Sequence, residues 1–310
     1  MGQSCKLTAC RCYKALVTDK FSDVPGVRIG HAHDARAMTG VTVIVPDAPC
    51  VMAVDVRGGG PGTRETDALH PSTLVERVHG LSLSGGSVFG LAAGDELVLM
   101  LSAAGQGLAI GEGLPVLPVV PGAILFDLAN GGDKAWGPEP PYRRLARQAF
   151  AALGHHDASG RHGAGHGARA GSRTGGIGSA SATLSTGHRI GALVAVNSFG
   201  EVHEGAPPEG PVPMPKLGRV TSLARQNTSI GAIATDAPLT RAQAQRIAMM
   251  AQDGLARAIR PIHTPFDGDC LFVLSTAAET GQGSDPVALT EIGTLAADLV
   301  ARAVRRAVAG

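Results

Sequence analysis

The chain has 310 residues, with 27 Lys and Arg against 26 Asp and Glu, and its formal net charge is +1. Such a balance gives no concentrated basic face of the kind that nucleic acid requires. A hydrophobic content of 44% with 17% charged residues is typical of a globular protein and excludes a disordered one. No apolar run approaches the ~18 residues of a membrane span. The five cysteines, three of them within the first 12 residues, do not form a secreted disulfide framework. We therefore expect a cytoplasmic protein with neither nucleic acid nor membrane as a partner.

Apolar runs bounded by turn residues predict short strands along the whole chain. In chain order they are 41–45 and 51–56, which we expect to pair across the turn at 46–49, then 81–84, 190–196, 229–234 and 271–274. Helical spacing predicts four helices, at 87–104, 142–153, 240–257 and 286–308. Between them, 130–176 and the proline-rich stretch 205–225 are expected as long loops. Strands and helices mixed in this way favour a layered α/β sandwich.

Ser87 offers one candidate site, because Gly85-Gly86-Ser87 stands where a hydrolase nucleophile elbow would lie, between a strand and a helix. The elbow needs G-x-S-x-G, and Phe89 occupies the last glycine position. Close packing of the helix on the sheet is the plainer interpretation of these glycines.

A loop rich in histidine and glycine offers two further candidates. His155, His156, His162 and His166 could hold a transition metal if the loop folded around it, but no convincing carboxylate or cysteine stands at ligand spacing. Residues 163–168 match a loose G-x-G-x-x-A, yet they follow a loop and not the strand that a nucleotide site requires. We expect exposed histidines without a ligand, no metal and no cofactor.

Thr228 follows Asn227 where the proline-rich stretch meets a strand, and it has two interpretations. It can be an ordinary strand residue. Alternatively, a cut before it would place its hydroxyl beside a free α-amine, whose pKa of ~7.7–8.0 suits a base. This is how an N-terminal threonine nucleophile is activated.

Several blocks of sequence, in one order over 21–310, resemble a known family. They are 23–31, 54–67, 83–90, 175–181, 192–197, 227–231 and 261–269. The chain is similar to the P1 family of self-processing N-terminal-nucleophile peptidases and amidases, which includes L-aminopeptidase/D-esterases, β-aminopeptidases and nylon-oligomer endohydrolases, and within it to the threonine branch. Residues 1–20 fall outside the resemblance and are expected as an N-terminal extension.

The resemblance implies a four-layer α/β/β/α sandwich and a single hydrolase domain over 21–310 that cuts itself between Asn227 and Thr228. Fragments 1–227 and 228–310 would stay together, and the protein would be a homo-oligomer. It would hydrolyse small peptides or amides, including ω-amino-acid amides, through a threonine acyl-enzyme without a cofactor. An acyltransferase of ornithine acetyltransferase type and a non-catalytic oligomeric binding protein are the alternatives.

The resemblance also implies the site. Thr228 would be the nucleophile, and the Asn197 side-chain amide would donate to the oxyanion. Asp267 and Asp269 would accept from the threonine hydroxyl and the new ammonium, although Pro-Phe-Asp-Gly-Asp is also a good turn sequence.

The chain departs from some relatives in one respect, since Ser172 or Arg173 stands in the region of their active-site lysine. An arginine there could supply fixed charge but could not act as a base. The tyrosine that helps to bind the oxyanion in some members has no clear counterpart, and Tyr142 is only weakly matched.

Overall fold

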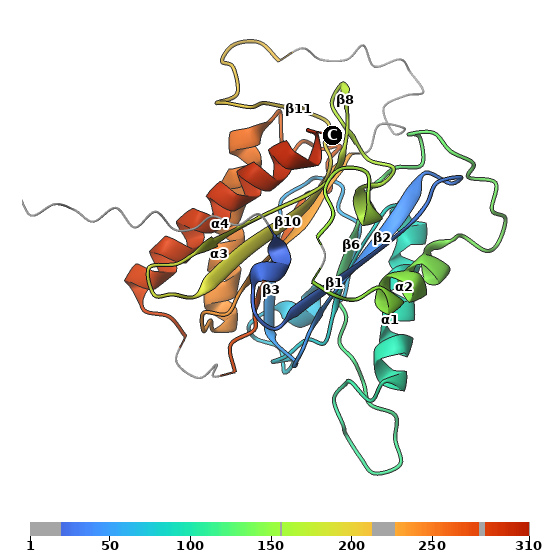
Figure 1. The fold of residues 1–310 in the computed structure, drawn as a ribbon, viewed down its shortest axis with the longest axis vertical. Coiled ribbons are helices and arrows are strands. Elements are labelled where there is room, and N and C mark those ends of the chain that lie inside the picture. Colours follow the sequence, from blue (N-terminus) through green and yellow to red (C-terminus); the bar gives the residue numbers. More distant parts are fainter. Residues whose placement is uncertain (1–19, 156, 213–226, 279–282, 310) are drawn as a thin grey trace, which may run out of the picture.

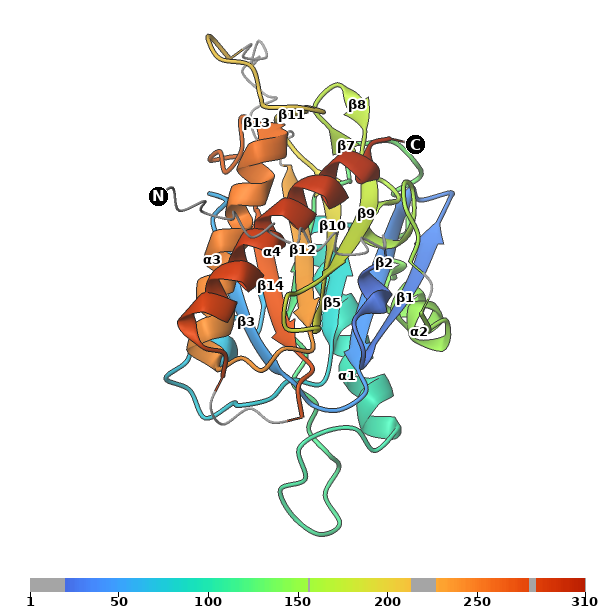
Figure 2. The same cartoon turned by 60° about the vertical axis from the view of Figure 1, so that its left-hand side comes forward.

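Two five-stranded sheets lie face to face, and each carries a pair of helices on its outer side (Figures 1 and 2). The computed structural model of the chain describes residues 20–155, 157–212, 227–278 and 283–309. Residues 1–19 of the expected extension and residues 213–225 of the proline-rich stretch lie outside the described residues.

The first sheet is mixed, with β5 and β6 parallel and its other pairs antiparallel. Its strands, in spatial order, are β1 (Val27–Asp34), β2 (Thr39–Pro46), β5 (Leu81–Ser84), β6 (Gly122–Ile124) and β4 (Thr63–Arg64). Helices α1 (Ala92–Ala103) and α2 (Tyr142–Ala151) cover its outer face.

The second sheet contains the strand that begins at Thr228. In spatial order its strands are β3 (Val51–Val56), β14 (Cys270–Ser275), β12 (Thr228–Thr235), β10 (Arg189–Asn197) and β9 (Gly176–Thr183). Only β12 and β14 run parallel. Helices α3 (Arg241–Ala258) and α4 (Pro286–Ala307) lie against its outer face (Figure 2).

Short elements connect these layers. The two-residue strand pairs are β7 (Arg169–Ala170) with β8 (Arg173–Thr174) and β11 (Glu201–Val202) with β13 (Ile259–Arg260), and the 3-10 turns are η1 (Phe21–Asp23), η2 (Asp67–Leu69), η3 (Ser87–Leu91) and η4 (Gly163–Gly165).

Three apolar layers separate the four structural layers. Leu83 of the first sheet and Phe272 of the second belong to the core between the sheets. Leu97 of α1 belongs to the core under the first helix pair, and Ile247 of α3 to the core under the second. Because burial of apolar surface is the main driving force for folding, these three cores fix the α/β/β/α order. The predicted four-layer sandwich is confirmed.

Caps fix where the second helix pair begins. The Thr240 hydroxyl accepts from the Gln243 N–H, and the Gln243 side chain accepts from the Thr240 N–H, forming a capping box. Asp285 caps α4 in the same way through the N–H groups of Val287 and Ala288. Both helices therefore start within a residue of the predicted boundary.

Two sequence predictions need correction. The strands at 39–46 and 51–56 do not pair, because the turn between them carries the chain from the first sheet to the second. The expected helix 87–104 is a 3-10 turn, η3, followed by α1.

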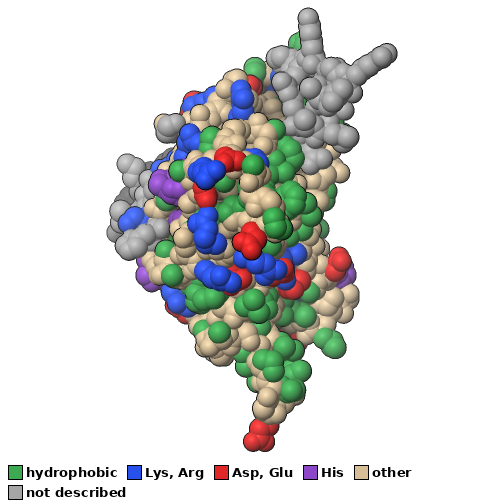
Figure 3. Space-filling view, turned by 90° about the vertical axis from the view of Figure 1, so that its right-hand side faces the viewer, with side chains coloured by type: hydrophobic (Ala, Val, Ile, Leu, Met, Phe, Trp, Pro, Cys, Tyr) green, Lys and Arg blue, Asp and Glu red, His purple; other side chains and the backbone are tan. Residues whose placement is uncertain are grey.

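On the face that α1 and α2 cover, charged side chains of both signs alternate across the middle of the molecule (Figure 3). Arg143 contacts Asp95 at 3.0 Å and Arg147 contacts Glu96 at 2.5 Å, so α2 is linked to α1 by ion pairs. No helix in the described part of the chain is long and apolar enough to cross a membrane.

The crossing of α3 over α4 depends on Gly254, since a Cβ added there would lie 2.2 Å from the carbonyl oxygen of Ala297. We expect Gly254→Ala to lower the free energy of unfolding by roughly 1–3 kcal/mol through overpacking, although alanine is the better helix former. Gly205→Ala is the control, because no heavy atom lies within 4 Å of its added Cβ. Urea denaturation measures both variants, and equal stability of the two would contradict such close packing.

Candidate active site

The peptide bond between Asn227 and Thr228 is held by backbone pairing at the start of β12. Asn227 forms a parallel bridge with Asp267. The Asn227 N–H donates to the carbonyl of Phe266 at 3.0 Å, and the Gly268 N–H donates to the carbonyl of Asn227 at 3.0 Å. The bond thus lies at the end of a buried central strand, fixed from the side of residues 266–268.

The Thr228 hydroxyl lies directly against the carbonyl of Asn227. Thr228 is 3% exposed; its Oγ1 donates to that carbonyl oxygen and accepts from the Gly268 N–H at 3.2 Å. One N–H group therefore contacts both the hydroxyl oxygen and the carbonyl oxygen. A donor in this position would stabilise negative charge on the carbonyl oxygen if the carbonyl carbon were attacked.

The glycine-rich block after β3 makes room for this arrangement. The N–H groups of Gly58 and Gly60 donate to the carbonyls of Asp269 and Asp267, at 3.2 and 2.8 Å. A Cβ on Gly58 would lie 2.3 Å from the backbone nitrogen of Asp269. Only glycine allows the loop to lie this close to the segment that holds Thr228.

Asn197 stands at the end of β10, directly opposite Thr228 in the antiparallel register. Its Oδ1 accepts from Asn130 Nδ2 at 2.9 Å and from the Arg169 N–H at 2.8 Å, and its Nδ2 donates to the Phe126 carbonyl at 2.9 Å. Two donors at one atom fix which way the amide points. Asn130 is a site residue that the sequence analysis missed, because it lies in a loop far from Asn197 in the chain.

Asp267 and Asp269 are both fully buried beside Thr228, but their hydrogen-bond donors are other groups. Asp267 accepts from the N–H and hydroxyl of Thr264, at 3.0 and 2.6 Å, and from the Phe199 N–H at 3.2 Å. Asp269 accepts from the Ser229 N–H at 2.7 Å, and its other oxygen contacts His263. The Asp269 carboxylate thus holds the backbone directly after Thr228, and the Asp267 carboxylate holds the backbone of Thr264 and Phe199.

Burial and the neighbouring charge of Asp269 raise the pKa of Asp267 to about 6. Hydrogen bonds from Thr264 and Phe199 act in the opposite direction. Burial is the larger of the two causes, so the buried position of this carboxyl favours its neutral form.

The residues in the lysine region contact other parts of the protein. Ser172 donates from its N–H and hydroxyl to Glu201, at 2.8 and 3.0 Å. Arg173 donates to the Val308 carbonyl at 3.0 Å. Tyr142 is buried in the first sheet's outer core, with its hydroxyl 3.3 Å from Thr39 Oγ1, and burial raises its pKa. None of these hydrogen bonds joins them to Thr228.

The alternative sites lie elsewhere. Ser87 occupies a left-handed conformation, with φ of 52°, and its N–H donates to the Leu125 carbonyl at 3.0 Å. No hydrogen bond from its hydroxyl to a histidine appears in the described ranges. Residues 163–165 form a 3-10 turn against β2 and do not start a helix after a strand.

The histidine loop meets β1. The rings of His166 and His33 stack with centroids 4.2 Å apart, and His162 lies edge-on to His33 at 5.8 Å. Burial, followed by the charges of His162 and His33, lowers the pKa of His31 to about 4. His156 lies outside the described residues. Within the described ranges, no group of three or more His, Cys, Asp or Glu side chains is arranged to hold a metal ion.

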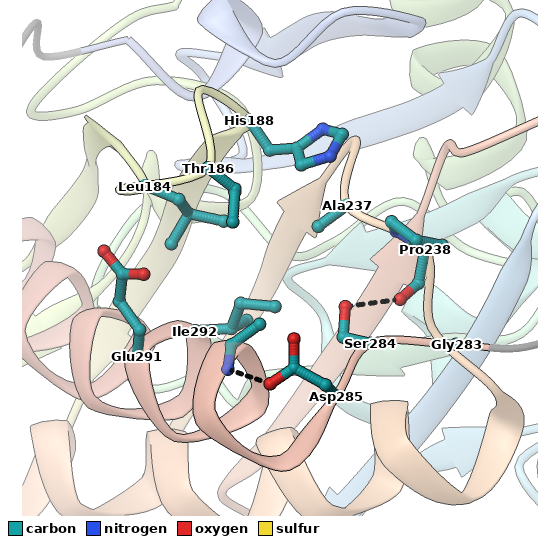
Figure 4. A pocket seen from close by; sticks show the side chains of 11 residues that line it. Leu184, Thr186, His188, Ala237, Pro238, Gly283, Ser284, Asp285, Glu291 and Ile292 are labelled. Atoms are coloured by element: carbon teal, nitrogen blue, oxygen red, sulfur yellow. Dashed lines mark hydrogen bonds between the residues drawn. The ribbon is translucent and has the colours of Figure 1, made fainter.

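A pocket of about 210 Å³ opens at the opposite end of β12, between the loop after β9 and the start of α4 (Figure 4). Its carboxylates have structural partners: Asp285 caps α4, and Glu291 accepts from the N–H and hydroxyl of Ser185. The reactive geometry is at the Thr228 end.

Comparison with known proteins agrees with the resemblance. The model of peptidase family S58 matches residues 19–310. An uncharacterized aminopeptidase of Mycobacterium leprae is 43% identical over 94% of this chain and 90% of its own length. A 6-aminohexanoate-oligomer endohydrolase of Paenarthrobacter ureafaciens is 30% identical over 92% of this chain and 84% of its own length.

Solved structures agree on the fold. A β-aminopeptidase of Burkholderia sp. aligns with a TM-score of 0.72 and 25% identity, covering 93% of this chain and 85% of that one. An L-aminopeptidase D-Ala-esterase/amidase of Ochrobactrum anthropi, described as a new variant among the Ntn hydrolase fold, aligns with a TM-score of 0.69 and 21% identity over the same shares. The predicted family, the Ntn-type fold and an amide hydrolase activity are confirmed.

The raised pKa of Asp267 predicts a pH dependence of stability. The folded chain holds this proton more tightly than the unfolded chain, in which the pKa is near 3.8. The contribution of Asp267 to the free energy of unfolding is therefore greatest below pH 4 and falls by roughly 3 kcal/mol as the pH rises through 6.

Urea denaturation at pH 4 and pH 7 tests this in a Thr228→Ala background, which lacks the hydroxyl next to the Asn227 carbonyl. We expect Asp267→Asn to remove the fall. If the free energy of unfolding fell equally between pH 4 and pH 7 with and without Asp267, the fall would come from other groups.

Proposed function

The chain belongs to peptidase family S58, and from this we propose that it cuts itself between Asn227 and Thr228 and then hydrolyses amides through the Thr228 hydroxyl. The observation that carries the proposal is the position of that hydroxyl, buried and hydrogen-bonded to the carbonyl that it would attack. The Gly268 N–H, 3.0 Å from the same carbonyl oxygen, supports it as a donor to the oxyanion.

Self-cleavage proceeds in two steps. Thr228 Oγ1 adds to the carbonyl carbon of Asn227, the carbon–nitrogen bond breaks, and the hydroxyl proton ends on the Thr228 nitrogen. Water then hydrolyses the ester, which leaves a carboxylate on Asn227 and restores the hydroxyl beside a free α-amine.

Turnover uses the same oxygen. The α-amine, whose type has a pKa of ~7.7–8.0, takes the proton as Oγ1 attacks a substrate amide. The leaving amine carries the proton away, and water resolves the acyl-enzyme. One hydrogen of Asn197 Nδ2 is bound to the Phe126 carbonyl, and the second would meet the substrate oxyanion.

Asp267 and Asp269 hold the mature N-terminus in this scheme. Asp269 already accepts from Ser229, the next residue along β12, at 2.7 Å. Each carboxylate has lone pairs beyond those that these hydrogen-bond donors use. The new ammonium at Thr228 would fill one of them, which also relieves the repulsion between the two buried carboxylates.

The substrates would be small peptides or ω-amino-acid amides. An aminopeptidase at 43% identity supports peptides, and a 6-aminohexanoate-oligomer endohydrolase at 30% identity supports ω-amino-acid amides. The same relatives favour hydrolysis over transfer of the acyl group to an amine, and catalysis over simple binding. We also propose that the protein is a homo-oligomer.

Cleavage can be read directly from a denaturing gel. We expect purified wild-type protein to give two bands, residues 1–227 and residues 228–310, with the smaller one beginning Thr-Ser-Ile-Gly on N-terminal sequencing. Thr228→Ala should remain one band and be inactive. Ser87→Ala should process and turn over like wild type, and a continuous wild-type chain that hydrolyses substrate would overturn the mechanism.

A substitution of Asn197 should affect turnover more than self-cleavage. In the proposed scheme the Gly268 N–H stabilises the oxyanion of self-cleavage, and the Asn197 amide stabilises the oxyanion of turnover. We expect Asn197→Ala to lower kcat on a 6-aminohexanoate oligomer by about 10²–10³-fold, with a smaller effect on self-cleavage. Asn130→Ala, which only removes a contact that orients Asn197, should cost less. Equal losses of processing and turnover in Asn197→Ala would show that one donor serves both reactions.

A further inference from the structure

His263 is bound to Asp269 by two groups at once. Its backbone N–H donates to Asp269 Oδ2 at 3.1 Å, and its ring Nδ1 lies 2.9 Å from the same oxygen. An ionised carboxylate only accepts, so Nδ1 carries the hydrogen in this contact. The other carboxylate oxygen is thereby left to the Ser229 N–H, next to the nucleophile.

The backbone of His263 adopts a left-handed conformation, which only a few per cent of residues other than glycine occupy. Its φ is 55°, in the left-handed region. Such conformations persist where surrounding contacts over-determine them, and they gather at functional sites. Here the turn brings the ring back onto Asp269, only six residues further along the chain.

We propose that His263 is a positioning residue for Asp269: its ring holds the carboxylate aimed at the start of β12, so that self-cleavage and turnover by Thr228 depend on that ring. The inference rests on the proposed function, because Asp269 acts through the nucleophile that it helps to place. His263 Nε2 is buried and has no hydrogen-bond partner within the described ranges, so the ring keeps one free position on the side away from Asp269.

Other titratable groups lie close to the His263–Asp269 pair. Asp267 and Cys270 lie on the same segment, and the charge of Asp269 contributes to the raised pKa of both. From β3, Asp55 contributes to the raised pKa of Cys270, and Arg57 pairs with Asp55 at 2.7 Å while its N–H donates to the Asp269 carbonyl. His263 is thus the group that places a ring N–H donor on the Asp269 carboxylate.

Three substitutions of His263 distinguish the effect of its ring N–H from the effect of its backbone conformation. Asparagine tolerates the left-handed conformation and can present an N–H near the position of Nδ1. Glycine accepts the conformation but has no donor, and alanine has neither advantage. We expect His263→Asn to process and turn over within several-fold of wild type, and His263→Gly and His263→Ala to be slower by roughly 10- to 100-fold, the range for losing a hydrogen bond to a charged group.

The pH profile gives the readout that a purely structural role would not move. The charge of Asp269 already raises the pKa of Asp267, and loss of the ring donor leaves that charge less compensated. The acid limb of the self-cleavage rate should therefore move to higher pH by roughly one unit in His263→Gly and stay in place in His263→Asn. His188→Ala is the matched control: its Nδ1 lies 3.5 Å from Asp236 at the opposite end of the sheet, beside the pocket of Figure 4, and it should leave the rate and the limb unchanged.

The outcomes are distinct. If wild-type protein does not process and Thr228→Ala behaves like it, the proposed function fails. If wild type processes normally but His263→Gly matches it in rate and in acid limb, only the role of His263 is overturned. A slow His263→Gly whose acid limb stays at the wild-type pH also overturns it, because the ring would then serve folding alone.

Discussion

The pairing of Asn227 with residues 266–268 is the constraint on which the rest of the site depends. It fixes the carbonyl of Asn227 through the Gly268 N–H and places the Thr228 hydroxyl against that carbonyl. The strand β14 that follows residues 266–268 runs parallel to β12 and next to it. The site is therefore an extension of the sheet, and its geometry has the rigidity of the buried strands beneath it.

Charge is concentrated around this backbone frame. Two fully buried aspartates lie two residues apart, which is costly unless donors compensate them. The donors come from several directions: Thr264 and Phe199 for Asp267, and Ser229 and His263 for Asp269. Repulsion between the two carboxylates is not fully compensated, and it contributes to the raised pKa of Asp267. A cationic N-terminus at Thr228 is the group that this environment lacks, and the proposed cleavage creates one.

The sequence predicted much of this, and the exceptions have physical causes. Apolar runs located β5, β10, β12 and β14, and helical spacing located α3 and α4, because these elements obey local rules. Strands β1 and β9 were missed because Gly30, Gly176 and Gly178 lower strand propensity. In the structure a Cβ on Gly30 would lie 1.9 Å from the Ala149 carbonyl oxygen of α2, and one on Gly178 would lie 2.1 Å from that of Ala303 in α4. These glycines are required by packing between layers, which periodicity within a strand does not reveal.

Some residues of the candidate site were expected from the sequence and others were found only in the structure. Asn197, Thr228, Asp267 and Asp269 were expected from the family resemblance, and the structure brings them to one end of the second sheet, although their roles stay proposals. Asn130 and the Gly268 N–H were not expected. Asn130 contacts Asn197 across 67 positions of sequence, and a backbone N–H has no sequence signature at all. The pairing of 41–45 with 51–56 failed because a turn sequence does not say whether the chain returns to the same sheet.

In the second sheet, strands from the two sides of the proposed cut lie next to one another. Strands β12 and β14 belong to the segment after residue 227, yet they lie between β3 and β10, which precede it. A cut before β12 would leave two polypeptides that contribute strands to the same sheet. They could separate only if the hydrogen bonds between the central strands broke and two hydrophobic cores became exposed. The peptide bond before β12 can be broken only once both neighbouring strands are seated, so the scission would itself mark the completion of folding.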